Sequence, residues 1–311
     1  MNNQVLGLHH ITAIAGNAKI NHDFYTRILG LRLVKKTVNF DDPGTYHFYY
    51  GNETGDPGTI LTFFPWEGIG AGKTGTGMAT DIRYAVADGS LPFWADRLKQ
   101  YNIRQTPVTE VFGEQSLGFQ DPDGLNLNLI VAAQQDDRTP WKTTEIDAAN
   151  AVRGFHSVLL TLKNIKATAE ILTDIFGYRL LEQQGNRYRF ITDAVTTAAV
   201  IDLVELPAGT PGVSAAGTNH HIAFRVKDEA VQMAFREKIQ SKGLNITPKI
   251  DRDYFYSLYF REPGGVLFEI ATDNPGFATD ETVENLGSSL RLPKQYEPSR
   301  AKIEAVLPKL N

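Results

Sequence analysis

A short segment repeats along the chain, and this repetition limits the possible folds more than any other feature of the sequence. HHITAI at 9–14 reappears as HHIAF at 220–224, and a weaker copy, FHSVL, lies at 155–159. A fourth segment, DIRYAV at 81–86, has the same strand character without a histidine. Similar segments at four places predict a protein built from four copies of one small unit.

An amphipathic stretch follows each copy and predicts a helix. In the first copy Ile20, Phe24 and Ile28 recur every fourth residue, so they share one helical face. The four stretches have nearly equal lengths. Each one stops at a residue that tolerates the left-handed conformation beyond a helix end. These residues are Gly30, Asn102, Gly177 and Gly243.

A hairpin closes the copies. FQDPDGLNLN at 119–128 matches FREPGGVLFE at 260–269, and each is a strand, a turn and a second strand. We therefore predict an α+β fold of four βαβββ modules, beginning near residues 5, 78, 153 and 218. The predicted segments are a first half with two modules (1–134), a polar linker (135–152), a second half with two modules (153–274) and a C-terminal tail (275–311).

Composition excludes several classes of protein and site. There are no cysteines, which excludes disulfides, zinc–thiolate sites and cysteine nucleophiles. The formal net charge is −5 without a basic run, so a nucleic-acid partner is not expected. No apolar stretch approaches the ~20 residues that span a bilayer. The first residues do not resemble a signal peptide, so we expect no membrane association and a cytoplasmic location.

The repeated histidines and acidic residues predict a metal site. Alternate residues of a strand share one face, and each module then offers two residues to the inside of a curled sheet. Two imidazoles and one carboxylate form the arrangement that suits Fe(II) and related ions. From spacing, His221 and Glu269 are candidate ligands, and His10 and His156 are equal candidates for the third. The four inward pairs are His10 and Thr62, Asp81 and Asn128, His156 and Asp202, and His221 and Glu269.

Other residue patterns carry less weight. His22 lies in a predicted helix and His47 in a predicted strand, and both are interpreted as surface or packing residues. The glycine-rich segment 68–75 has the wrong spacing for a phosphate-binding loop and is interpreted as a flexible loop.

The chain resembles the vicinal oxygen chelate superfamily (glyoxalase and extradiol dioxygenase), and within it the hydroquinone-type ring-cleaving dioxygenases. The similarity covers nearly the whole chain, and its blocks are more specific than the module pattern alone. The resemblance implies two half-open barrels. The matching blocks are 7–12, 29–47, 57–65, 153–157, 251–255 and 276–281.

The resemblance implies a site and a chemistry. The metal ligands would be His10, His221 and Glu269, which requires the first and fourth modules to share a barrel. The cofactor would be Fe(II), with Mn, Zn or Ni as other divalent ions that could occupy the site, and the partners a small aromatic substrate and O2. The residues implied around the substrate are His9, Thr12, His220, Arg252 and Tyr259.

Three alternatives stay open at this point. Pairing of the third and fourth modules would use His156 as a ligand, as in catechol-type extradiol enzymes. A glyoxalase-like isomerase or lyase would use a metal without O2. A binding or resistance protein of the same fold would need no ligands at all. The sequence leaves the oligomeric state, including a homo-oligomer, undecided.

Overall fold

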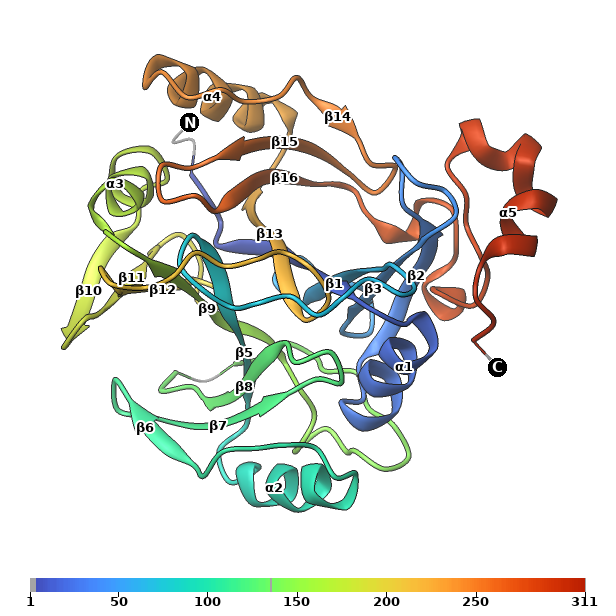
Figure 1. Cartoon of the computed structure of the whole chain (residues 1–311), viewed down its shortest axis with the longest axis horizontal. Coiled ribbons are helices and arrows are strands. Elements are labelled where there is room, and N and C mark those ends of the chain that lie inside the picture. Colours follow the sequence, from blue (N-terminus) through green and yellow to red (C-terminus); the bar gives the residue numbers. More distant parts are fainter. Residues whose placement is uncertain (1–3, 135, 311) are drawn as a thin grey trace.

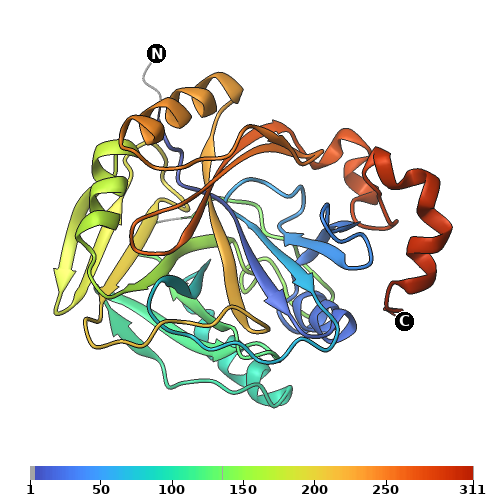
Figure 2. The same cartoon turned by 45° about the horizontal axis from the view of Figure 1, so that its top comes forward.

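The strands form two eight-stranded sheets, and each curls into a half-open barrel (Figures 1 and 2). The computed structural model describes residues 4–134 and 136–310; residues 1–3, 135 and 311, which belong to the predicted first half, linker and tail, lie outside the described part. The first sheet runs in the order β14 (Ile250–Asp251), β15 (Phe255–Arg261), β16 (Leu267–Pro275), β13 (Thr218–Val226), β1 (Leu8–Ala15), β4 (Ile60–Pro65), β3 (Tyr46–Gly51) and β2 (Arg32–Val38).

The second sheet repeats this arrangement strand for strand, with modules two and three in place of modules one and four. In the centre of each sheet two modules meet through an antiparallel pair, β1 with β13 in the first sheet. The module pairing implied by the resemblance is therefore the one in the structure. The second sheet runs in the order β10 (Arg179–Gln184), β11 (Arg187–Ile191), β12 (Val200–Glu205), β9 (Gly154–Leu162), β5 (Met78–Val86), β8 (Asn126–Val131), β7 (Glu114–Gln120) and β6 (Thr109–Val111).

Capping residues mark the ends of the helices. The Asn17 side chain accepts a hydrogen bond from the backbone N–H of Ile20 at the start of the first helix. Beyond the helix ends, Gly30 and Asn102 adopt positive φ of 69° and 56°, as predicted. The helices of the modules are α1 (Ala18–Asp23) with the π-helical turn η1 (Phe24–Ile28), α2 (Leu91–Gln100), α3 (Lys166–Glu170) with the π-helical turn η2 (Ile171–Ile175), and α4 (Glu229–Ser241).

One apolar core extends through both sheets. α2 lies against β7 and α4 against β15 and β16, so the helices cover the outer faces (Figure 1). Large side chains such as Trp94, Phe155 and Phe224 are buried in this core. Within the described ranges 4–134 and 136–310, no helix is both long and apolar enough to cross a membrane.

The tail covers the edge of the first sheet. In Figure 1 it lies beside β2, and the backbone N–H of Arg291 donates to the carbonyl of Lys36 on that strand. The fully buried Lys35 ammonium binds Asp280 at 2.6 Å and Glu281 at 2.5 Å. The tail therefore covers the edge of β2, which would otherwise present unpaired backbone groups. Its helices are η3 (Phe277–Thr279), η4 (Val283–Asn285), η5 (Lys294–Ser299) and α5 (Arg300–Val306).

Bulges fix which residues face the inside of each sheet. In the β1–β13 ladder, His9 and His220 are extra residues, because Leu8 and His10 pair with the adjacent Phe224 and Ala223. In the β5–β9 ladder the extra residues are Thr80 and His156. Each bulge turns the following residue inward. The four residues that follow a bulge are His10, Asp81, Ser157 and His221.

Candidate metal centre

Three side chains from three strands converge inside the first sheet. His10 comes from β1, His221 from β13 and Glu269 from β16. The Nε2 atoms of the two histidines lie 3.3 Å apart, and Glu269 Oε2 is 3.2 Å from His10 Nε2 and 2.9 Å from His221 Nε2. All three side chains are buried. Among the residues that the structure describes, these form the one His/Asp/Glu cluster compact enough to hold a metal ion.

The first histidine of each pair orients the second. His9 Nδ1 lies 2.9 Å from His10 Nδ1, and His220 Nδ1 lies 2.8 Å from His221 Nδ1. When the Nδ1 of a ligand histidine carries the proton, it donates to its neighbour, and Nε2 keeps a free lone pair. This is how outer partners usually fix a metal-binding imidazole. The repeated His-His sequence therefore supplies both ligands and their orienting groups.

The carboxylate is positioned in the same manner. Ser257 donates a hydrogen bond of 2.5 Å to Glu269 Oε1, which leaves Oε2 directed at the imidazoles. Glu269 Oε2 has no hydrogen-bond donor of its own in the described chain. A buried carboxylate oxygen without a donor, facing two imidazole nitrogens, fits a divalent cation.

A cavity of about 360 Å³ opens beside the cluster. This is within the ~300–1,000 Å³ that small-molecule sites usually occupy. Phe40, Phe64, Trp66 and Phe255 give the cavity aromatic walls, and polar side chains line the rest of it. The polar lining consists of His10, Thr12, Asn39, Asp41, Asp42, His47, Tyr49, His220, His221, Arg252 and Tyr259.

Four of the five residues implied around the substrate line this cavity. They are Thr12, His220, Arg252 and Tyr259. His9 lies elsewhere: it is buried behind His10, packed against Phe255 with ring centroids 5.2 Å apart. Arg252 lies with its guanidinium 5.5 Å from the Tyr259 ring centroid and 5.3 Å from that of Phe40.

The interpretation of His47 from the sequence missed its place in the site. Its ring is buried and lines the cavity, with Nε2 2.9 Å from Thr62 Oγ1. Tyr49, two residues later on the same face of β3, bonds the other ring nitrogen. Alternation along β3 could have placed both side chains inward. Nothing in the module pattern marked that face as polar.

The second sheet holds an ion-pair network in the corresponding place. By strand order and register, Asp81, Ser157 and Asp202 correspond to His10, His221 and Glu269. Arg83 bridges the two carboxylates, binding Asp81 at 2.9 Å through Nε and Asp202 through Nη1. Arg189 also binds Asp202, at 2.9 Å. Two guanidiniums therefore neutralise the two carboxylates, so this sheet needs no metal for charge balance.

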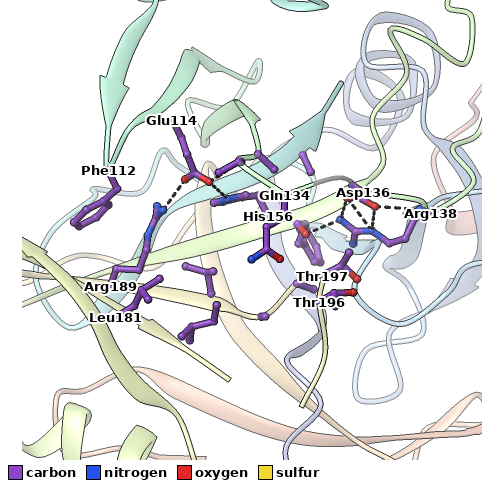
Figure 3. Close-up of a pocket in the computed structure, with 18 of the residues that line it drawn as sticks. Phe112, Glu114, Gln134, Asp136, Arg138, His156, Leu181, Arg189, Thr196 and Thr197 are labelled. Carbon is purple, nitrogen blue, oxygen red and sulfur yellow. Dashed lines mark hydrogen bonds and ion pairs between the residues drawn. The ribbon is translucent and has the colours of Figure 1, made fainter. Parts of the chain in front are cut away.

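His156 occupies a different place from the one predicted by spacing. It is the bulge residue, equivalent to His9 and His220 rather than to His10, and its Nδ1 lies 3.0 Å from Ser157 Oγ. The spacing argument was wrong by one residue. His156 Nε2 lies 3.0 Å from Glu114, which also binds Arg189 at 2.6 Å (Figure 3).

Stability at low pH should depend on Glu114. Burial alone raises its pKa, but the hydrogen bonds and charges of His156 and Arg189 outweigh burial and lower it to about 2. A depressed pKa contributes stability above the unfolded value of 4.5 and loses it as the pH falls toward 2. At one pKa unit per 1.36 kcal/mol, this is about 3 kcal/mol.

Glu114→Gln should therefore give a flatter profile of unfolding free energy between pH 5 and pH 3 than the wild type. Urea unfolding at several pH values measures this. Glu110→Gln, at an exposed residue of β6, serves as the control and should follow the wild type. Parallel profiles for the wild type and Glu114→Gln would contradict the assignment.

Two half-barrels of βαβββ modules, with a His–His–Glu cluster inside one of them, define the class of protein. The chain belongs to the Glyoxalase/Bleomycin resistance protein/Dioxygenase superfamily, whose sequence profile matches residues 7–129 and 154–270. The resemblance and the fold class predicted from the sequence are thus confirmed.

Individual relatives are similar over the full length. A Bacillus subtilis (strain 168) protein, provisionally named ring-cleaving dioxygenase MhqO, is 47% identical over 98% of this chain and 96% of its own. Chlorohydroquinone/hydroquinone 1,2-dioxygenase of Sphingobium indicum is 35% identical over 94% of this chain and 93% of its own. A crystal structure of a provisionally assigned dioxygenase from B. subtilis superposes with a TM-score of 0.95, at 45% identity, over 99% of this chain and 98% of that one. Relatives of this kind imply a bound metal, an aromatic substrate and O2.

Proposed function

We propose that this protein is an Fe(II)-dependent ring-cleaving dioxygenase of hydroquinone-type aromatic compounds. The observation that carries the proposal is the buried cluster of His10, His221 and Glu269 at the base of an aromatic cavity. His10 and His221 would hold the ion through their Nε2 atoms and Glu269 through its carboxylate, a donor set that suits Fe(II). When bound, Fe(II) would supply the redox chemistry that lets electrons pass from an aromatic ring to O2. The relatives named as ring-cleaving and hydroquinone dioxygenases support this choice.

The chain's own residues would bind and orient the ring. Phe40, Phe64 and Phe255 exclude water and pack against an aromatic substrate. The Arg252 guanidinium is a permanent positive charge at the cavity wall, which favours a substrate oxygen in its phenolate form. Burial raises the pKa of Tyr259, so its hydroxyl stays protonated and can donate to the same oxygen or to a neighbouring one.

Oxygen uptake tests the proposed reaction. Enzyme loaded with Fe(II) under anaerobic conditions should consume O2 with a substituted hydroquinone faster than with a catechol. A catechol offers a second adjacent oxygen, which His220 and Arg252 would crowd. Uptake with catechols only, or isomerisation of a glutathione hemithioacetal without O2, would overturn the proposal. The latter would support the glyoxalase-like alternative.

Arg252→Ala should slow turnover much more than it weakens metal binding. Loss of a preorganised donor that acts on the transition state costs ~2.7–4 kcal/mol, or a factor of ~10²–10³ in kcat. Metal content by mass spectrometry and O2 uptake separate the two effects. Arg261→Ala is the matched control, because Arg261 is exposed and bonds the backbone of the β15–β16 turn. Equal activity in both variants would exclude Arg252 from the reaction.

A further inference from the structure

A chain of hydrogen bonds runs from the wall of the cavity to a metal ligand. The Tyr49 hydroxyl lies 2.9 Å from His47 Nδ1, and His47 Nε2 lies 2.9 Å from Thr62 Oγ1. Thr62 Oγ1 is 2.8 Å from Thr12 Oγ1, which is 2.9 Å from His221 Nε2. All five side chains are buried. The chain joins β3, β4, β1 and β13 across the inside of the first sheet.

The first member sets the direction of the chain. In the part of the protein that the structure describes, the Tyr49 hydroxyl has one hydrogen-bond partner, His47 Nδ1. A buried phenol hydrogen needs an acceptor, so Tyr49 donates and Nδ1 accepts. The proton of the neutral His47 ring is then on Nε2 and is donated to Thr62. Thr62 in turn donates to Thr12, whose own hydrogen points onward. Burial lowers the pKa of His47 well below its usual range, which agrees with a neutral ring.

The last donor and a metal ion compete for one lone pair. Without a metal, the Thr12 hydrogen is donated to His221 Nε2. That lone pair is also the one that His221 would use as a ligand, so metal binding must turn the Thr12 hydrogen away. Thr12 lines the cavity, and because its hydroxyl already accepts from Thr62, its hydrogen is directed onward as a donor.

We propose that Tyr49, His47 and Thr62 are positioning residues that fix Thr12 as a hydrogen-bond donor to a substrate oxygen. The ligand chemistry favoured at this position is an acceptor, such as a phenolate or carbonyl oxygen of the ring compound. This inference rests on the proposed function for the identity of the substrate. The direction of the chain itself does not depend on it.

Two measurements test the proposal, and neither uses turnover. The ¹⁵N NMR spectrum of the metal-free protein reports which His47 nitrogen carries the proton, with the signals assigned by their loss in His47→Gln. Anaerobic calorimetry of the Zn(II)-loaded protein gives the affinity for a hydroquinone, because Zn(II) has no redox chemistry. Tyr49→Phe removes the first donor. Tyr50→Phe is the control, because the Tyr50 hydroxyl is equally buried on β3 but donates to Asn21 outside the chain.

We expect His47 to be protonated on Nε2 in the wild type and in Tyr50→Phe, and to lose this preference in Tyr49→Phe. The hydroquinone should bind about three- to tenfold more weakly to Tyr49→Phe, the effect of one hydrogen bond. A wild-type His47 protonated on Nδ1, or unchanged affinity in Tyr49→Phe, would overturn the proposal. Wild-type protein that binds no hydroquinone would contradict the proposed function instead. The tautomer of His47 would then still test the direction of the hydrogen bonds from Tyr49 to Thr12.

Discussion

Replacing Glu269 with alanine should remove bound metal from the protein while the fold remains. Two imidazoles alone are a poor site for a divalent ion, so affinity should fall by more than the ~10–100-fold that loss of an outer partner costs. Because burial lowers the pKa of His221 and keeps that ring neutral, the substitution leaves no unpaired positive charge on it. Metal content after Fe(II) loading and the circular dichroism spectrum measure the two expectations.

The histidines provide a matched pair for the same experiment. His10→Ala should lose metal as Glu269→Ala does, whereas His156→Ala should keep it, because His156 lies in the second sheet and bonds Glu114. Metal retained in His10→Ala and lost in His156→Ala would move the site to the other barrel and favour a catechol-type enzyme.

Arg83→Met should strongly destabilise the protein through the second sheet. It leaves Asp81 and the fully buried Asp202 facing each other with one cation fewer. Removal of one partner of a buried ion pair typically costs ~3–5 kcal/mol. The unfolding free energy from urea titration should fall by about that amount, while metal content stays unchanged.

A control and a rescue sharpen this prediction. Arg225→Met breaks a half-exposed pair with Asp273 and should cost less than ~1 kcal/mol. Asp202 keeps its ion pair with Arg189, so Asp81 is the carboxylate that loses its ion-pair partner. Adding Asp81→Asn to Arg83→Met removes that charge, and the double variant should be more stable than Arg83→Met alone. Additive losses in the double variant would show that the charge of Asp81 is not the cause.

Much of the fold could be predicted from the sequence because modules are local. The helix face of Ile20, Phe24 and Ile28, and the stops at Gly30 and Asn102, follow from short-range chemistry. Which modules share a sheet is a long-range property, and spacing alone left it open. The division into segments 1–134, 135–152, 153–274 and 275–311 stays a prediction, and each sheet combines modules from both predicted halves.

The repeated sequence segments made part of the candidate site predictable. His221 and Glu269 were found from spacing, and the choice of His10 over His156 needed the resemblance. A β-bulge adds one residue to a strand without a sequence signal of its own. Counting residues therefore assigned His156 to an inward-facing ligand position, whereas in the structure His156 is the bulge residue. His47 and the tail residues that bind Lys35 act through contacts between segments far apart in the chain, and no local pattern contains such contacts.

The pairing of the first module with the fourth has a consequence for the synthesis of the protein. About 150 residues separate the end of β4 at Pro65 from the start of β13 at Thr218. At ~5–20 residues per second, a ribosome needs roughly 8–30 s for this stretch. The second sheet, built from consecutive modules, can assemble during that time, while β1 waits for its central partner. A nascent chain therefore carries His10 long before it carries His221 or Glu269, and capture of the metal ion belongs to the last stage of translation or follows it.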